Sequence, residues 1–344
     1  MSTDTIRVGI IGAGSNTRAK HIPGLREIEG VEIISVRNST DESSRKAAGE
    51  LEIPRWHGNW RELVEADDID AVVIGTWPYM HCRCTVAALE AGKHVMCEAR
   101  MARSADEARR MLEAAQMRPH LVAQVVPSPF TLEVDATIRR MIGEGFLGEP
   151  VAVEVVDRRG FADDRPDYHW RNDFELSGFN TMSLGIWYEA IMRWLGEATS
   201  VQAGGRIVKP MLEREGQPCV TRIFDELDVM GEMACGARLR MRLSTVTGPP
   251  ERHVTIAGTE GALRYDGETL ASCARGEDEF APVEIPDEKR GGWRVEQEFI
   301  GAVRGEEEIK LTRFEDGVRY MEFVEATVRA AQQRERVELP MVHC

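Results

Sequence analysis

The sequence predicts an α/β protein of two domains, the first with a doubly wound parallel sheet and the second with an antiparallel or mixed sheet. Over the first third of the 344 residues, short β-branched runs alternate with helical segments, the pattern of βαβ units. The run Pro127-Ser128-Pro129 then breaks this pattern. Beyond it, strands follow one another with one intervening helix, as in an α+β domain. We therefore expect domains at residues 1–126 and 127–344.

The first domain is expected to open on a buried strand, Ile6–Ile11, that runs into a glycine turn and an amphipathic helix. The run Ala71–Gly75 has no polar side chain, which indicates a parallel strand buried on both faces. Gly92 is the expected C-terminal glycine of the helix before it. The remaining strands are expected at Val31–Val36, His94–Cys97 and Leu121–Val126, and the helices at Ser43–Leu51, Trp60–Ala66, Cys82–Ala91 and Ala105–Met117.

The second domain is expected to contain mostly strands, with one helix among them near Thr181–Leu195. A large sheet packed on one face has to cover its other face, which favours a partner subunit. The strands are expected at Val151–Val156, Ser200–Ile207, Val220–Met230, Ala237–Thr245, Val254–Ala257 and Gly261–Tyr265, with further helices at Leu132–Ile142, Arg294–Val303 and Asp316–Ala331.

Charge and hydropathy exclude several classes of partner. The chain has 43 Lys and Arg against 58 Asp and Glu, a net charge of −15. Nucleic acids and anionic membranes attract basic surfaces, so we expect neither as a partner. No basic start precedes an apolar run, and nowhere do about 18 apolar residues follow one another. We expect a soluble, unexported, cytoplasmic protein.

The seven cysteines are scattered and lack paired C-x-x-C spacing. Cys82 and Cys84 lie two residues apart on an expected helix, so they point to different faces and are poorly placed to bind one ion. We expect free thiols and no metal site.

The glycine turn after the first strand is typical of dinucleotide binding. Gly12 allows the tight turn, and Gly14 lets the backbone approach a pyrophosphate at the start of the next helix. The third glycine of the usual fingerprint is missing, which indicates an extra residue in this turn. The cofactor-binding residues expected here are Gly12, Gly14, Ser15, Asn16 and Thr17.

The end of the second strand bears on the choice between NAD and NADP. A carboxylate there binds the ribose hydroxyls and repels a 2′-phosphate. Arg37, Asn38 and Ser39 instead offer a cation and neutral hydrogen-bonding groups, which favours NADP over NAD. Asp41 lies close by, so NAD stays open.

Several further motifs resemble those of the Gfo/Idh/MocA family, which includes glucose-fructose oxidoreductase and inositol dehydrogenase. They run through nearly the whole chain: Thr76-x-Pro78-x-x-His81, Gly92-Lys93-His94-Val95, Leu147-Gly148-Glu149-Pro150, Trp170-Arg171, Gly258-Thr259-Glu260-Gly261 and Glu315-Asp316-Gly317. The resemblance implies a Rossmann domain and a second domain with a large open, mostly antiparallel sheet that pairs subunits into a homodimer or homotetramer. It also implies a small, carbohydrate-like substrate.

The resemblance further implies cofactor contacts from Thr76, Trp77, Pro78, His81, Glu98 and Ala99. Glu98 matches a glutamate that positions the ribose or nicotinamide region of the cofactor. Tyr79 and His81 follow a strand at the edge where open α/β sheets collect ligands, although capping of the next helix is the favoured role for His81.

The chain departs from the family at its proton-transfer residues. The family's Glu-Lys-Pro motif reads Glu98-Ala99-Arg100 here, so the lysine is absent. A second family motif places an aspartate and a histidine four residues apart on one helix face. Ser183 and Trp187 occupy those positions, and neither titrates near neutral pH.

Other residues are candidates for the missing roles. His169, with Tyr168 before it and Asp164 and Asp167 nearby, is the best substitute base, although a solvated loop is the plainer interpretation. Arg100 stays protonated and can orient a substrate or stabilise negative charge, or else contact a cofactor phosphate. Trp187 either stacks on a sugar ring or packs in the core. The expected substrate residues are Arg100, Asn180, Ser183 and Trp187.

These observations favour an NAD(P)-dependent oxidoreductase acting on a secondary hydroxyl of a sugar, cyclitol or glycoside, with an atypical proton-transfer set. One alternative is a non-catalytic dinucleotide-binding sensor or scaffold, because three catalytic positions are changed. Another is a redox-assisted lyase, isomerase or hydrolase that recycles a tightly held cofactor.

Overall fold

The computed structural model describes residues 5–161 and 167–341 and divides the chain into two compact units. Unit 1 takes in the chain up to Pro127 together with Arg294–Val318. Unit 2 takes in Ser128–Trp293 and the chain from Arg319 onward. Residues 294–318, which the sequence placed in the second domain, thus belong with the first unit.

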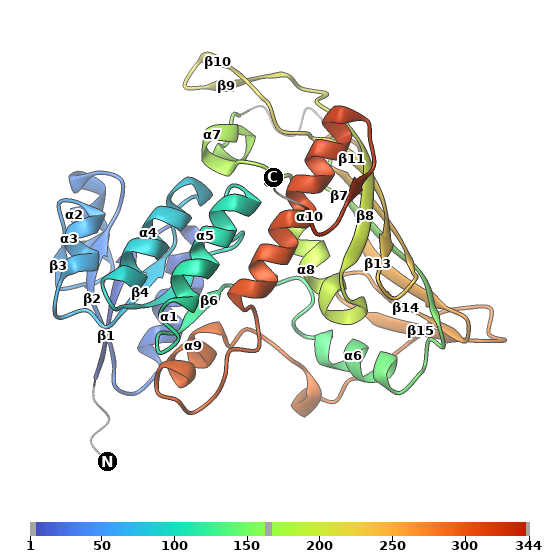
Figure 1. The fold of residues 1–344 in the computed structure, drawn as a ribbon, viewed down its shortest axis with the longest axis horizontal. Coiled ribbons are helices and arrows are strands. Elements are labelled where there is room, and N and C mark those ends of the chain that lie inside the picture. The colour runs from blue at the N-terminus through green and yellow to red at the C-terminus, as the bar shows by residue number, and fades with distance from the viewer. Residues whose placement is uncertain (1–4, 162–166, 342–344) are drawn as a thin grey trace. The chain divides into compact units, whose positions relative to one another are not determined.

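Unit 1 is built on a parallel sheet of six strands in the order β3-β2-β1-β4-β5-β6, which confirms the predicted doubly wound fold (Figure 1). The strand order reverses between β1 and β4, and ligands of such sheets bind at that switch point. The strands are β1 (Ile6–Ile11), β2 (Val31–Arg37), β3 (Arg55–Trp56), β4 (Ala71–Ile74), β5 (His94–Cys97) and β6 (Ala123–Val125).

The helices of unit 1 follow the predicted order, with one clear difference in a boundary. Helix α4 begins at Pro78 rather than at Cys82, because a proline at the first helical position needs no N–H partner and already has helical φ. The helices are η1 (Thr17–His21), α1 (Ile22–Arg26), α2 (Asp41–Glu50), α3 (Trp60–Glu65), α4 (Pro78–Glu90), α5 (Ala105–Gln116) and α9 (Val295–Val303).

Unit 2 contains a nine-stranded sheet in the order β16-β15-β14-β13-β7-β12-β11-β8-β17. Only β7 and β12 pair in parallel, so the mostly antiparallel sheet is confirmed among the described residues. The strands are β7 (Pro150–Arg158), β8 (Ala198–Arg206), β11 (Glu226–Met233), β12 (Arg238–Ser244), β13 (Glu251–Gly258), β14 (Gly261–Tyr265), β15 (Leu270–Ala274), β16 (Ala281–Pro282) and β17 (Val337–Glu338).

The single strand predicted at Val220–Met230 is wrong. The chain forms a separate hairpin of β9 (Met211–Arg214) and β10 (Gln217–Val220) before β11 begins. The carboxylate of Asp225 accepts the amide hydrogens of Val208 and Lys209 at 2.8 and 2.9 Å, which ties the chain on both sides of the hairpin together. Hydrophobic alternation alone gives no sign of this tie.

Helices cover one face of the unit 2 sheet (Figure 1). The rings of Tyr188 on α8 and Phe323 on α10 stack with centroids 3.7 Å apart. On the other face side chains are exposed, and Met230 is 60% exposed beside Gln202 and Arg240 on the neighbouring strands. The helices are α6 (Asp135–Gly143), η3 (Trp170–Asn172), α7 (Phe174–Ser177), α8 (Leu184–Leu195), η4 (Asp287–Lys289) and α10 (Phe314–Gln333), the last of which crosses the unit boundary.

Candidate functional site

The glycine turn of unit 1 lies at the switch point of the sheet. Gly12 has φ +92°, and a Cβ on it would lie 2.7 Å from the carbonyl carbon of Gly75 and the amide nitrogen of Thr76. A Cβ on Gly14 would meet only the Gly75 oxygen, at 3.5 Å. Gly12 is therefore required by the close approach of β1 and β4, whereas Gly14 and the next residue, Ser15, form the exposed rim of the turn.

A π-helical turn, η1, follows the glycines. A π turn carries one residue more than an α turn. Thr17 is 1% exposed, and its hydroxyl donates to the carbonyl of Gly12 at 3.1 Å. The wide turn also directs His21, at its end, into the interior, where its side chain is fully buried.

His21 is held between two carboxylates, and no motif in the sequence pointed to it. Its Nδ1 lies 2.5 Å from Glu296 and its Nε2 lies 2.9 Å from Glu98. Burial disfavours the charged imidazole, but the hydrogen bonds to the two glutamates outweigh it and raise the pKa of His21 to about 9. Glu98 also accepts hydrogen bonds from the side chain of Asn16 and the backbone N–H of Ala99.

The same hydrogen bonds fix the charge on Glu98. Burial acts to raise the pKa of its carboxyl, but the bond to protonated His21 and the attraction between the two charges prevail and lower it. Glu98 is thus an oriented carboxylate between β5 and the glycine turn, with Asn16 and Ala99 as its other partners.

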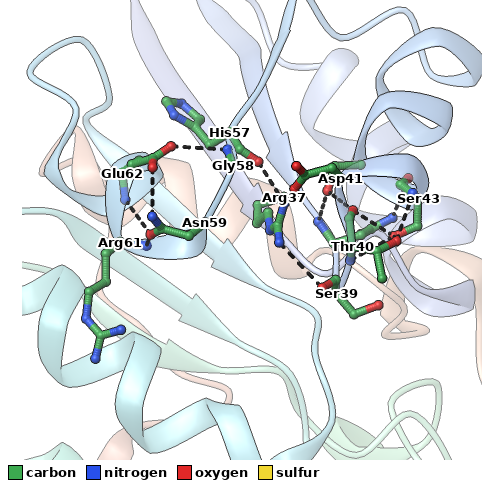
Figure 2. A network of polar contacts seen from close by, with 12 residues as sticks. Arg37, Ser39, Thr40, Asp41, Ser43, His57, Gly58, Asn59, Arg61 and Glu62 are labelled. Atoms are coloured by element: carbon green, nitrogen blue, oxygen red, sulfur yellow. Dashed lines mark hydrogen bonds and ion pairs between the residues drawn. The ribbon is translucent and has the colours of Figure 1, made fainter.

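The end of β2 is a network of side chains (Figure 2). Asn38 accepts the N–H of Ala13 at 2.8 Å and donates to the carbonyl of Ser43 at 3.1 Å, so it clamps the glycine turn. Arg37 donates to Asp41 at 2.6 Å and to the carbonyl of His57 at 3.0 Å. Its side chain is only 12% exposed, against 62% for Asp41, so the carboxylate is the more exposed charge of this pair.

Ser39 and the segment after β4 provide further polar groups. Ser39 is exposed, and its carbonyl lies 3.4 Å from the guanidinium of Arg37. Thr76 has a buried hydroxyl with no hydrogen-bond partner among the described residues. Trp77, 45% exposed, precedes Pro78 at the start of α4.

His81 is fully buried and joins two backbone segments. Its Nδ1 lies 3.0 Å from the carbonyl oxygen of Arg100, and its Nε2 lies 2.9 Å from that of Thr76. Burial acts to lower the pKa of His81, and this effect outweighs the backbone hydrogen bonds, which act to raise it. Arg100 itself is 8% exposed. His81 therefore braces the ends of β4 and β5 behind the surface that a ligand would meet.

In unit 2, Ser183 and Trp187 both bind one buried carboxylate, Asp157 on β7. The Ser183 hydroxyl and the Trp187 indole N–H donate to the same oxygen, at 2.6 and 3.0 Å. Two guanidiniums face this carboxylate, with Arg159 at 3.3 Å and Arg252 at 3.7 Å. Burial acts to raise the pKa of Asp157, but the bonds from Arg159 and Ser183 outweigh it and lower it.

Two of the expected substrate residues are buried in the interior of unit 2. Trp187 is 0% exposed and packs edge-on against the ring of Phe130, with centroids 5.4 Å apart. In this arrangement its ring has no face open to a sugar. Asn180 is 5% exposed and donates to the carbonyl of Ser177 at 2.7 Å.

His169 and Tyr168 lie in a different part of unit 2, against the β9–β10 hairpin. The amide of Tyr168 donates to the carbonyl of Glu213 at 2.7 Å, and burial raises the pKa of its phenol. His169 is exposed, and its Nδ1 accepts the N–H of Arg171 at 3.3 Å as the cap of η3. Of the acidic neighbours expected there, Asp164 lies outside the described residues.

The structure thus brings the expected cofactor residues together at the ends of β1, β2, β4 and β5, and it joins Ser183 to Trp187 through Asp157. It does not join His169 and Tyr168 to that pair in any described contact. Within residues 5–161 and 167–341, no group of three or more His, Cys, Asp or Glu side chains is placed to hold a metal ion. No helix in these ranges has the length and apolar character needed to cross a membrane.

Two family models match the chain. One, described as an oxidoreductase family with an NAD-binding Rossmann fold, matches residues 6–125. The other, described as a GFO/IDH/MocA C-terminal domain, matches residues 136–264. Together they cover most of both units.

Named relatives are similar to this chain over part of its length. An inositol 2-dehydrogenase/D-chiro-inositol 3-dehydrogenase of Shouchella clausii is 32% identical over 159 residues, 45% of each chain. A 1,5-anhydro-D-fructose reductase of Ensifer adhaerens is 34% identical over 152 residues, 43% of this chain and 44% of the relative. The matched stretch therefore spans less than half the length of both curated relatives.

Among solved structures, levoglucosan dehydrogenase in complex with NADH and L-sorbose has a TM-score of 0.86 at 20% identity. The match covers 98% of this chain and 99% of that one. At this identity the similarity concerns the fold alone.

Proposed function

Because the chain belongs to the Gfo/Idh/MocA family of oxidoreductases, we propose that it is an NAD(P)-dependent dehydrogenase or reductase for a secondary hydroxyl of a sugar, cyclitol or glycoside. The glycine turn at the switch point of the parallel sheet is the observation that carries this proposal. Relatives named for inositol and 1,5-anhydro-D-fructose support a polyol or sugar as substrate.

The residues present fit a dinucleotide. The exposed rim at Gly14 leaves room for a pyrophosphate beside backbone N–H groups, and the buried hydroxyl of Thr76 can pair with a polar group brought by a ligand. Glu98, fixed as a carboxylate, is suited to accept hydrogen bonds from a ribose or carboxamide. A bound nicotinamide would accept or deliver the hydride, so the protein itself has to supply orientation and a route for the proton.

The end of β2 argues for NAD over NADP once its contacts are considered. Arg37 is engaged by Asp41 and by the carbonyl of His57, and Asp41 is the more exposed of the two charges. An exposed carboxylate favours ribose hydroxyls and repels a 2′-phosphate. We therefore propose NAD as the preferred cofactor, against the preference for NADP drawn from the sequence.

The proton route is unusual in this chain. Ser183 and Trp187 are hydrogen-bonded to Asp157 and do not ionise near neutral pH, so we assign them to holding that carboxylate. His169 is the exposed imidazole proposed for proton transfer. Since its Nδ1 accepts the N–H of Arg171, a neutral His169 carries its proton on Nε2 and accepts another only by giving up this cap.

The burial of Ser183 and Trp187 also favours a second candidate, a dinucleotide-binding sensor without redox chemistry. Restoring the family residues would distinguish the two. Because an aspartate at position 183 would meet the charge of Asp157, the restored variant should combine Ala99→Lys, Ser183→Asp and Trp187→His with Asp157→Asn. Turnover gained only in this variant would favour the sensor.

The direct test is calorimetry with NAD and NADP, followed by a panel of sugars and polyols monitored at the nicotinamide absorbance. We expect binding of NAD and turnover of at least one neutral or charged polyol. Folded protein that binds neither cofactor would refute the proposal. Protein that binds NAD but turns over no member of a broad panel would favour the sensor.

We further propose that a second copy of the chain covers the exposed face of the unit 2 sheet. The exposed Met230 and the charged side chains of β12 on that face support it. Light scattering of the purified protein tests this, with a dimer or tetramer as the expected result and a monomer as the contrary one.

A further inference from the structure

We propose that Arg159 and Arg252 form a binding site for an anionic group, carboxylate or phosphate, on the sugar or polyol substrate. This inference rests on the proposed function for the reaction, but the site itself is argued from contacts within unit 2.

The two arginines converge on one aromatic ring and one carboxylate. The guanidinium carbons of Arg252 and Arg159 lie 4.5 and 5.8 Å from the centroid of Phe130. Both guanidiniums also face Asp157, with Arg159 nitrogens at 3.3 Å and Arg252 Nε at 3.7 Å. Two cations from β13 and from the end of β7 thus meet around one ring.

The cluster of Arg159, Arg252 and Asp157 has more positive than negative charge. Asp157 supplies one negative charge and is 1% exposed, whereas Arg159 and Arg252 supply two positive charges at 31% and 40% exposure. The Asp157 oxygens already accept hydrogen bonds from Ser183 and Trp187. One positive charge therefore remains within the cluster, on the side accessible to solvent.

The remaining N–H groups suit an oxyanion. A guanidinium has five N–H donors in a planar fork that matches carboxylate and phosphate oxygens. In the described ion pair between Arg252 and Asp157, Nε is the nitrogen that approaches the carboxylate. The two terminal nitrogens of Arg252 are therefore not paired with Asp157. Both guanidiniums lie over the ring of Phe130, which adds a cation–π contact that helps to hold them in this place.

This cluster also gives the changed motif a physical reason. An aspartate at position 183 would compete with Asp157 for the same two guanidiniums and repel it. Ser183 and Trp187 instead donate neutral hydrogen bonds that fix Asp157 as the anchor of the arginines. Ser183 and Trp187, in place of the family's aspartate and histidine, thus remove an acid/base pair. By holding Asp157, the same two residues help to place Arg159 and Arg252 beside α8.

The test measures the binding of three ligands to the full-length protein in the presence of NAD. D-glucuronate and D-glucose 6-phosphate carry the two anionic groups, and D-glucose is the neutral reference. We expect one of the anionic sugars to bind at least tenfold more tightly than glucose by calorimetry at low salt, as charge-assisted hydrogen bonds would give. Which of the two binds identifies the anion as carboxylate or phosphate.

Variants locate the site. Arg252→Gln and Arg159→Gln should each lose most of this preference, measured as the ratio of the affinity for the anionic sugar to that for glucose. Arg264→Gln is the matched control, because Arg264 precedes the buried Tyr265 on β14 and so lies on the other face of the sheet. Equal affinity for all three ligands, or equal loss in the control, would overturn the anion site.

The outcomes separate this inference from the proposed function. Preferential binding of an anionic sugar without turnover would retain the site and count against the oxidoreductase. Turnover of neutral sugars with no preference for charge would retain the oxidoreductase and overturn the anion site.

Discussion

The buried histidine of unit 1 makes the stability of the protein depend on pH in a predictable direction. His21 is fully buried between Glu98 and Glu296, and its pKa is raised from 6.5 to about 9. At about 1.4 kcal/mol per tenfold change, this shift corresponds to about 3 kcal/mol of folding free energy. Because the pKa is raised, the contribution is complete below pH 6.5 and is lost as the pH rises through 9.

The perturbation is His21→Gln, which keeps a polar side chain but removes the positive charge. We expect the variant to be less stable than the parent by about 3 kcal/mol at pH 6, and this difference to shrink by about the same amount by pH 10. Asn16, Glu98 and Glu296 are the polar groups whose hydrogen bonds to the ring are described. Since the variant has no imidazole at this position, the change of the stability difference with pH follows the titration of His21.

Urea unfolding of both proteins at pH 6, 7.5, 9 and 10 measures this difference, and nitrogen chemical shifts of labelled histidine give the titration directly. His120→Gln is the control, since His120 is an exposed histidine of the same unit. A stability difference that stays constant across this range would refute the argument, as would a His21 titration near pH 6.5.

Three other changes test the sites. Gly12→Ala places a Cβ 2.7 Å from the β4 backbone at φ +92°, so we expect a loss of about 1–3 kcal/mol in urea unfolding and no heat with NAD in calorimetry. Asp157→Ala leaves buried donors unpaired and should cost about 3 kcal/mol, measured as a lower urea midpoint. Asp41→Asn removes the exposed carboxylate at the end of β2 and should raise NADP affinity about fivefold, or ~1 kcal/mol, with NAD affinity nearly unchanged by calorimetry.

Most of the parallel sheet could be predicted because five of its six strands are encoded locally, whereas the two-residue strand β3 (Arg55–Trp56) was not predicted. The apolar run predicted at Ala71–Gly75 forms β4 at Ala71–Ile74. The return of residues 294–318 to the first unit could not be predicted in this way. It depends on contacts such as that between His21 and Glu296, which lie 275 residues apart.

The glycine turn could also be found from the sequence, because its chemistry depends on a few adjacent residues. The Asp157 cluster could not, because its parts come from β7, α8 and β13. One signal was present. Asp157 continues the alternation of Val153 and Val155, so it occupies a position where the strand pattern expects an apolar, inward-facing residue.

The two charge clusters, each around a buried central group, have opposite composition, and this bears on where proton transfer can occur. In unit 1 one cation lies between two carboxylates, and in unit 2 one carboxylate lies between two cations. The central group of each is held in its charged form, since the pKa of His21 is raised and that of Asp157 is lowered. Neither changes its charge near neutral pH, and neither is suited to exchange a proton with a substrate. We therefore propose that a proton route in this protein uses an exposed group such as His169 or solvent, while His21 and Asp157 orient the groups around them.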